Sequence, residues 1–305
     1  MKHEVIPYPE NGPFPGETRK RAAVMVDQPG SDITELAVLG EQFPLRLLQL
    51  GFRLMQVVDA AGQDQFCYVI PPVCEVPAGS FLMGSDRQQD SDAADDELPQ
   101  YTMTVPMYHL AKYPLTVSEY DCFLYATQRV APRGWSRQQR SLDHPVTFVS
   151  WHDALAYAHW LAQVTGEEWR LPTEAEWEKA ARGGAELKRY PWGDRLDRNM
   201  ANFLIDPALK ATHGTTPCRS YPANGYGLFD MSGNVWEWVH DWYDARYYAS
   251  TGPRNPVGPP AGHLRIVRGG SWLVADVRML SCSHRHKVPP DTYSYAIGFR
   301  VASSL

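Results

Sequence analysis

Residues 268–302 read RGGSWLVADVRMLSCSHRHKVPPDTYSYAIGFRVA, and this stretch decides the fold. It opens on Arg268-Gly269-Gly270-Ser271-Trp272 and closes on Gly298-Phe299-Arg300-Val301. Between these two motifs the sequence shows neither sustained helical nor strict strand periodicity. We call residues 273–296 the C-terminal segment and expect it to form an exposed surface between two fixed ends, outside the core.

Five further motifs precede this stretch. They are Glu75-Val76-Pro77-Ala78-Gly79-Ser80-Phe81-Leu82-Met83-Gly84-Ser85, Arg170-Leu171-Pro172-Thr173-Glu174-Ala175-Glu176-Trp177-Glu178, Tyr190-Pro191-Trp192-Gly193, Asn224-Gly225-Tyr226-Gly227-Leu228 and Gly233-Asn234-Val235-Trp236-Glu237-Trp238. In this order the motifs resemble the formylglycine-generating-enzyme (sulfatase-modifying factor) family over roughly residues 75–302. The resemblance implies an α+β fold of the C-type-lectin kind, rich in loops, with short helices and small antiparallel sheets. Such a fold does not by itself fix function.

The oxidases of this family depend on residues that this chain lacks. The resemblance implies two copper-binding cysteines, one at the third position after the Gly-Gly-Ser and one five residues later. Val274 and Met279 occupy those positions, and neither side chain can supply a thiolate. Cys282 lies near these positions, but a single thiol cannot replace a pair of cysteines. The family's iron-dependent sulfoxide synthases carry an HxxxHxE cluster ahead of the module, and His3 is the only histidine between Met1 and Ser80. We therefore expect no copper and no enzyme of either kind.

A different branch of the same fold fits the C-terminal segment better. The chain resembles the variable proteins of diversity-generating retroelements, whose C-terminal repeat is rewritten at template adenines. Asn codons of the AAY type can become most residue types there, but not Trp, Met, Lys, Gln or Glu. Trp272, Met279 and Lys287 are therefore expected to stay fixed. The positions expected to vary and to bind ligand are Leu273, Val274, Ala275, His284, His286, Thr292, Tyr293, Ser294, Tyr295 and Ala296.

The residue types at these positions suit recognition. Tyr293 and Tyr295 offer large amphipathic contact area at little cost in rotamer entropy, and Thr292, Ser294 and the histidines offer adaptable hydrogen bonds, as in an antibody paratope. We expect a rigid scaffold that presents these loops to an unknown protein ligand. Two alternatives stay open: a metal-dependent oxidoreductase of this family with altered chemistry, and an interaction module whose segment does not vary.

Composition argues against several classes of partner. The chain has 305 residues, a formal charge of −6 and a pI near 5.9. Without a basic run, nucleic acid and anionic membranes are poor partners. No window reaches the roughly 18 apolar residues of a transmembrane helix and no signal peptide follows Met1, so we expect a cytoplasmic protein without membrane insertion. The five cysteines form no CxxC and are odd in number, which favours free thiols over disulfides.

Residues 1–74 form a small N-terminal unit ahead of the module, which we assign to residues 75–305. Prolines and glycines between Pro7 and Gly16 indicate an extended start. Residues 32–50 favour short helices interrupted at Pro44, and residues 52–58 and 65–70 predict a β-hairpin that ends at Pro71-Pro72. The unit carries no recognisable chemistry, and we expect it to dock or pack.

Three capping boxes predict helices within the module. Hydroxyl and carboxylate stand three residues apart at Thr116 and Glu119, Ser150 and Asp153, and Thr173 and Glu176, where they satisfy the first free amides of a helix. The second helix should bury Trp151, Leu155, Ala158 and Leu161, and the third should end at Gly183-Gly184. We expect most of the ten tryptophans to pack in the core.

Two acidic regions raise the question of calcium. Residues 85–98 lack the spacing of an EF-hand loop, and we interpret them as a solvated loop. Residues 230–237 are a better candidate, because two carboxylates flank a glycine-containing turn with free carbonyl oxygens. The resemblance implies one structural calcium there, held by side chains of Asp230 and Glu237 and by backbone oxygens of Gly233 and Val235. In the alternative, both carboxylates hydrogen-bond the backbone without a metal.

Histidines offer another route to enzyme chemistry. His284 and His286 lie two residues apart, so in a strand both would point the same way and could share a transition metal, although no third ligand is identifiable. His152 and His159 lie on one face of a predicted helix near Asp153, as a base and its orienting group would. We expect this second pair to be packed beside tryptophans instead.

Overall fold

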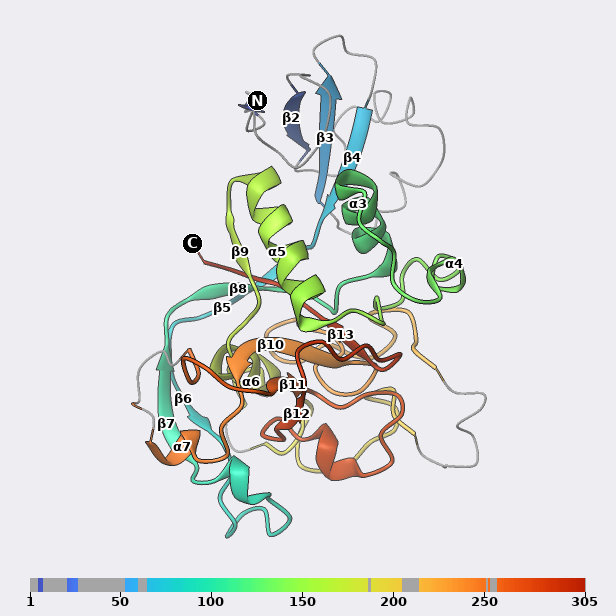
Figure 1. The fold of residues 1–305 in the computed structure, drawn as a ribbon. Helices are drawn as coiled ribbons and strands as arrows, with labels where there is room; N and C mark the ends of the chain where they lie inside the picture. The colour runs from blue at the N-terminus through green and yellow to red at the C-terminus, as the bar shows by residue number, and fades with distance from the viewer. Residues whose placement is uncertain are drawn as a thin grey trace.

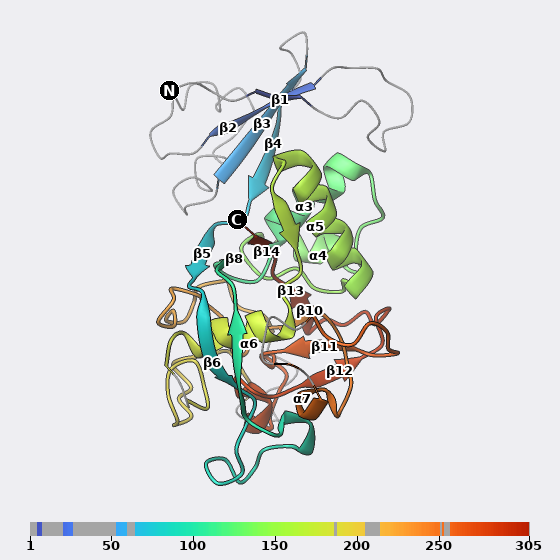
Figure 2. The same ribbon diagram turned by 90° about the vertical axis from the view of Figure 1, so that its left-hand side faces the viewer.

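The fold is α+β with short helices and small sheets, as predicted (Figures 1 and 2). The computed structural model describes residues 71–185, 188–204, 214–250, 252 and 257–304, together with the backbone of four earlier strands. These are β1 (Val5–Pro7), β2 (Arg21–Val26), β3 (Arg53–Asp59) and β4 (Gln65–Ile70), paired antiparallel in that order. The predicted hairpin of β3 and β4 is confirmed. The helices predicted in residues 32–50 lie outside the described residues.

Within the described residues, the module's strands form three further sheets. One joins β5 (Val73–Val76), β8 (Tyr108–Ala111), β14 (Ala302–Ser304) and β9 (Glu168–Arg170) in that order, and a second pairs β6 (Gly79–Met83) with β7 (Tyr101–Val105). The third runs β12 (His286–Val288), β11 (Arg265–Arg268), β10 (Trp236–Trp242) and β13 (Ile297–Phe299). Since β11 ends on the opening motif and β13 lies in the closing motif, this sheet anchors both ends of the C-terminal segment.

The three longest described helices begin at the predicted caps. Helices α3 (Val117–Thr127), α5 (Trp151–Thr165) and α6 (Glu174–Arg182) each start after a complete capping box, and α6 ends at Gly183 with φ of +59°. Shorter elements are α4 (Trp135–Gln138), α7 (Tyr247–Ser250) and the 3-10 turns η2 (Asp95–Glu97) and η4 (Val277–Leu280). No helix of the described ranges has the length and apolar character needed to cross a bilayer.

Aromatic packing dominates the core beneath α3 and α5. Tyr120 and Phe123 of α3 meet Tyr157 of α5 and Phe299 of β13, with ring centroids 5.2–6.4 Å apart. A second cluster forms around Trp177 of α6. Most tryptophans are buried, as predicted, among them Trp151, Trp160, Trp169, Trp177, Trp236, Trp238 and Trp272.

Candidate functional site

Buried ion pairs hold the two motifs that bound the C-terminal segment. Arg268 donates to Glu178 at 2.7 Å and to Glu174 at 3.1 Å, both on α6. Arg300 makes a two-pronged pair with Glu237 of β10, each contact 2.7 Å long. All five side chains are buried. Because paired charge-assisted hydrogen bonds set orientation as well as position, both ends of the segment are fixed to the core.

The turn that follows β11 requires glycine. Gly269 and Gly270 have φ of +93° and +75°, which L side chains rarely adopt. A Cβ on Gly270 would stand 2.7 Å from the Leu280 side chain and 2.9 Å from the carbonyl oxygen of Met279. The turn therefore presses the start of the C-terminal segment against η4, in the middle of the same segment.

Two tryptophans gather the predicted binding positions into one region. The indole N–H of Trp272, next to Leu273, donates to the carbonyl oxygen of Tyr295 at 3.3 Å, and the two rings lie 5.6 Å apart. The backbone N–H of Trp236 donates to the carbonyl oxygen of Ala296 at 2.9 Å. The structure thus brings the first and last parts of the segment together.

The predicted positions differ in how much they reach solvent. Ala275, Tyr293 and Tyr295 are exposed, Leu273, His284, His286, Thr292 and Ser294 are partly exposed, and Val274 and Ala296 are buried. The expectation that the whole segment lies outside the core is wrong for residues 280–283 and for Arg285, which are buried. The reason is electrostatic, because the Arg285 guanidinium pairs with the buried Glu174 carboxylate at 2.8 and 3.0 Å.

Residues 292–295 and Phe148 form what we call the tyrosine face. The N–H of Phe148 donates to the carbonyl oxygen of Ser294 at 2.9 Å, and its ring lies 6.1 Å from that of Tyr295. The N–H of Trp151, at the start of α5, donates to the carbonyl oxygen of Pro290 at 3.0 Å. Tyr293 is nevertheless 60% exposed and Tyr295 45% exposed. The backbone of this loop is held by the core while its large side chains face solvent.

The two C-terminal histidines share an aromatic partner. His286 stacks on Trp236 with ring centroids 4.9 Å apart, and the ring of His284 lies 5.9 Å from the same indole. Burial lowers the pKa of His286, and the neighbouring His284 and Lys287 add to the effect. His284 Nδ1 lies 3.3 Å from a carboxylate oxygen of Glu97. In the described part of the chain no three His, Cys, Asp or Glu side chains gather as a metal site would require.

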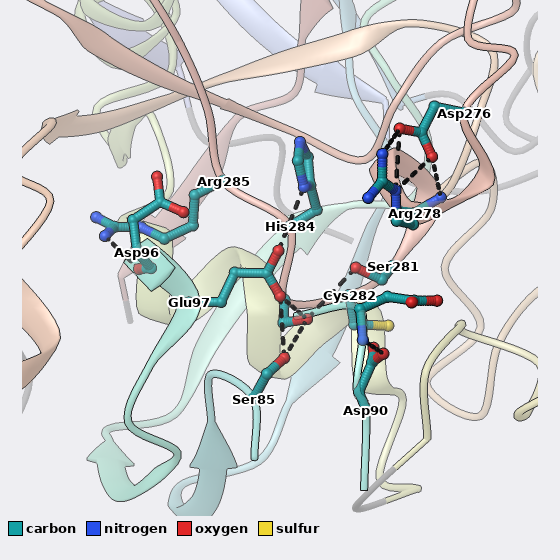
Figure 3. A network of polar contacts seen from close by, with 12 residues as sticks. Ser85, Asp90, Asp96, Glu97, Asp276, Arg278, Ser281, Cys282, His284 and Arg285 are labelled. Carbon is teal, nitrogen blue, oxygen red and sulfur yellow. Dashed lines mark hydrogen bonds and ion pairs between the residues drawn. The ribbon is translucent and has the colours of Figure 1, made fainter. Parts of the chain in front are cut away.

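A buried carboxylate joins the acidic stretch to the C-terminal segment (Figure 3). Glu97 accepts hydrogen bonds from Ser85 at 3.0 Å and from Ser283 at 2.9 Å, on the side away from His284. Burial acts to raise the pKa of the Glu97 carboxyl, but the hydrogen bond and charge of His284 and the two serine hydroxyls bring it below its ordinary value. Glu97 is therefore ionised and fully partnered.

The interpretation of residues 85–98 as a solvated loop is wrong at its end. Asp96 and Glu97 are buried. Asp96 accepts from Lys287 at 2.8 Å and from Tyr243 at 2.6 Å, and its backbone oxygen accepts from Arg285 at 2.9 Å. These contacts fasten η2 to the strand that carries His286.

The positions of the family's thiol pair are apolar and largely covered. Val274 is buried, and Met279 packs partly buried against the core. The Cys282 thiol is buried, which raises its pKa to about 12. Since only the thiolate acts as nucleophile or metal ligand, no described side chain at this place supplies the redox chemistry of the oxidases.

The calcium candidate at residues 230–237 is occupied by protein groups. Asp230 accepts from the N–H of Arg219 at 2.8 Å, and burial raises its pKa to about 6. Arg300 takes both Glu237 oxygens, and the indole of Trp177 donates to one of them at 2.8 Å. Calcium would have to displace a guanidinium from a dry site, so Glu237 does not fit as its ligand.

The rest of the candidate loop also packs against protein. The N–H of Gly233 donates to the carbonyl oxygen of Gly269 at 2.8 Å. A Cβ on Gly233 would stand 2.4 Å from the carbonyl oxygen of Asn202. Val235, the other proposed backbone ligand, is buried. The loop braces the opening motif directly, and a binding measurement decides whether calcium is also held here.

The helix histidines do not pack as expected. His152 and His159 are both exposed on α5, and His152 lies edge-on to Trp151 at 5.4 Å. The nearby Asp153 serves as the capping carboxylate, accepting from the Ser150 N–H at 3.0 Å and the Ser150 hydroxyl at 2.7 Å. The Asp153 carboxylate therefore caps the N-terminus of α5 and does not orient a histidine as a catalytic base.

The fold and the site together define a lectin-like module with a fixed scaffold and a loop surface at its C-terminal end. Residues 63–305 match the model of the sulfatase-modifying factor enzyme 1-like domain. The chain belongs to this family.

Relatives of this chain differ in their described activities. Over 252 residues it is 36% identical to serine/threonine-protein kinase Pkn1 of Chlamydia trachomatis, across 75% of this chain and 38% of the kinase. The chain thus spans little more than a third of that relative. Over 286 residues it is 34% identical to the formylglycine-generating enzyme of Streptomyces coelicolor, across 75% of this chain and 88% of the enzyme.

A solved structure shares the architecture. Treponema denticola variable protein 1 superposes with a TM-score of 0.62 and 22% identity, over 77% of this chain and 96% of that protein. At this level of identity the likeness shows the fold alone. The chain therefore shares its architecture with a protein that is called a variable protein.

Proposed function

We propose that this chain is a binding module and that its tyrosine face contacts a protein ligand. One observation carries the proposal: a loop whose backbone is bonded to the core leaves Tyr293 60% and Tyr295 45% exposed. Exposed tyrosines on a rigid backbone lose little entropy on binding and supply much of the energy in protein interfaces. Scattered exposed aromatics are common on protein surfaces, but these two lie within one short loop beside Phe148.

The partly exposed neighbours support a protein ligand over a small molecule. Thr292 and Ser294 alternate with the tyrosines and can hydrogen-bond a partner, and Leu273 and Ala275 follow Trp272, which lies against Tyr295. One pocket of the described residues, which Ser85 and Arg182 help to line, shares no lining residue with this face. Exposed tyrosines alternating with small polar side chains suit a protein surface.

The residues at the family's thiol positions argue against oxidase chemistry as the function. Val274 and Met279 stand where copper-binding cysteines would be expected, and Cys282 has a thiol whose pKa burial raises to about 12. An oxidoreductase of altered chemistry is the second candidate, favoured by the 34% identity to a formylglycine-generating enzyme. Copper or iron retained through purification, together with turnover of a thiol peptide, would establish it.

We further propose that the ligand-binding positions vary through retroelement-directed rewriting. In support, eight of the ten predicted positions are exposed or partly exposed, and Trp272, which the codon rule keeps fixed, is buried in the scaffold. On this proposal Val274 and Ala296 accept only small apolar residues, because larger or polar side chains would enter the core.

Alanine substitution of the tyrosines tests the binding proposal. A photo-crosslinking residue at position 292 identifies the ligand, and its affinity is then measured for Tyr293→Ala and Tyr295→Ala. Loss of a central tyrosine should weaken binding by about 30-fold or more, equivalent to at least ~2 kcal/mol. Tyr125→Ala on α3 is the matched control, since Tyr125 is 61% exposed.

Folding must be separated from binding in this test. Tyr293 keeps about 40% of a ~200 Å² side chain buried, which at ~25 cal/mol per Å² limits the loss of stability to about 2 kcal/mol, and the same bound holds for Tyr125. If the Tyr293→Ala and Tyr295→Ala proteins bind as tightly as the Tyr125→Ala protein, the tyrosine face is not the binding surface.

A further inference from the structure

A pocket of about 180 Å³ lies between the loop after β6, the end of α6 and residues 188–194. It shares no lining residue with the tyrosine face, and of the Glu97 network it includes only Ser85 and Ser283. Pockets for drug-sized ligands span roughly 300–1,000 Å³. This one therefore fits a ligand of about the size of an amino acid.

A single buried guanidinium holds the walls of the pocket in place. Arg182 donates to the carbonyl oxygen of Gly84 at 3.0 Å and to that of Lys188 at 3.2 Å. Its charge is balanced by Glu178 at 2.7 Å. Because the same side chain ties both walls to α6, the pocket is formed before any ligand arrives.

Two serines complete the wall that faces the C-terminal segment. Ser85 and Ser283 line the pocket, are both buried and hydrogen-bond each other at 2.8 Å. Behind them Glu97 accepts from both hydroxyls (Figure 3). The two hydroxyl protons serve three close contacts, so each points to Glu97 or to the other serine, and lone pairs of the serine oxygens remain as acceptors for a ligand.

The rim carries charges of both signs, and its ion pairs reach solvent. Lys188 lies 3.0 Å from Asp194, and Arg189 lies 3.5 Å from Asp90 and 3.3 Å from Asp92, on exposed or partly exposed side chains. The Asp86 carboxylate accepts the N–H of Gln88 at 2.9 Å and forms no ion pair with another described residue. Since exposed ion pairs contribute little, a ligand's own charges can replace them at small cost.

We propose that this pocket binds a small zwitterion, namely a free α-amino acid. Its ammonium group lies toward Asp86 and the serine oxygens, and its carboxylate lies toward Lys188 and Arg189. Carboxylates on the same rim disfavour a phosphate-like anion, and the two cations disfavour a bare metal ion. Among the residues that the structure describes, no aromatic side chain lines the pocket, which disfavours a stacked sugar or nucleobase.

Thermal shift with individual L-α-amino acids tests this proposal on the full chain. At about 100-fold excess over Kd, a binding amino acid should raise the melting temperature by about 5–10 °C. Ethanolamine, which lacks the carboxylate, and propionate, which lacks the ammonium group, should each give less than about 1 °C, since each satisfies one side only. A matching rise with either single-charge compound, or no rise with any amino acid, would overturn the zwitterion site.

Variants of two rim residues test whether the amino acid binds in this pocket. Asp86→Asn and Lys188→Gln remove one recognition charge each at partly or fully exposed positions, so the unliganded melting temperature should stay the same while the ligand shift disappears. Arg137→Gln, on the exposed helix α4, is the control and should keep the full shift. If Asp86→Asn and Lys188→Gln also keep it, the amino acid binds elsewhere and the assignment is wrong.

Discussion

Removing the Arg300 guanidinium should strongly destabilise the chain, because it would leave a buried carboxylate without its cation. In Arg300→Met the Glu237 carboxylate would keep only the Trp177 indole as a donor, at 2.8 Å. Arg300 and Glu237 side chains are 0% and 1% exposed, and both guanidinium contacts are 2.7 Å long. Breaking such a buried pair on one side costs about 3–5 kcal/mol.

This cost is large enough to see in a melting curve. For a domain of this size each kcal/mol shifts the midpoint by about 2–4 °C, so the predicted fall is about 6–20 °C. Differential scanning calorimetry measures it directly, and urea unfolding at one temperature gives the free energy. The closing motif and β10 should lose order first, since Arg300 of that motif pairs with Glu237 of β10.

Two further variants decide whether the effect is electrostatic. Arg278→Met removes an exposed arginine that pairs with Asp276 within the same segment, and it should leave the midpoint unchanged. The double variant Glu237→Gln with Arg300→Met removes both charges and should recover part of the loss, giving a coupling energy in a double-mutant cycle. Equal effects of Arg300→Met and Arg278→Met would refute the buried pair as the anchor of this segment.

Three other perturbations probe the remaining groups. Burial, with Glu174 nearby, raises the pKa of Asp241 from its ordinary 3.8 to about 8. The stability that this carboxyl contributes is complete below pH 3.8 and is lost as the pH rises through about 8. Asp241→Asn should therefore reduce the fall in melting temperature between these two pH values. Calcium and a chelator should both leave the melting temperature unchanged, because Arg300 and Trp177 occupy the Glu237 oxygens. A rise in melting temperature with calcium would contradict this and support a metal site at residues 230–237. Iodoacetamide should spare Cys282 in the folded chain at neutral pH, where its thiol stays protonated; rapid alkylation seen by peptide mass mapping would contradict its burial.

Local sequence signals predicted the helices well. Thr116 and Glu119 stand three residues apart, and the hydroxyl and carboxylate meet at 2.7 Å in the structure. A capping box depends only on a few neighbouring residues, so it can be recognised in the sequence without knowledge of the fold. The same is true of Gly183, whose left-handed conformation ends α6.

Local sequence patterns did not predict the contacts between residues that lie far apart in the chain. Residues 85–98 read as a solvated loop because their composition is acidic, yet Asp96 meets Lys287 and Glu97 meets Ser283, 191 and 186 residues away. Burial of a charge depends on a partner that only the tertiary fold supplies. For the same reason Phe148, which joins the tyrosine face through the Ser294 carbonyl, gave no signal of its own.

The candidate site was predicted in part. The composition of residues 292–295 indicated a contact surface, and the structure leaves both tyrosines exposed. The same inference extended too far along the segment, since Arg285 and residues 280–283 are buried by contacts to α6 and η2. Aperiodic sequence marks irregular backbone, but it does not tell whether the side chains face solvent or a buried charge.

The most direct test of the central claim is DNA sequencing of the coding region for residues 268–302 in many sibling isolates, together with the flanking DNA. We predict a near-copy of this region beside a reverse transcriptase gene, with substitutions confined to template adenines. They should fall at exposed positions such as 275, 293 and 295, while Arg268, Trp272 and Arg300 stay constant. Identical codons in every isolate and no such copy would contradict diversification, and the tyrosine face would then be a fixed surface.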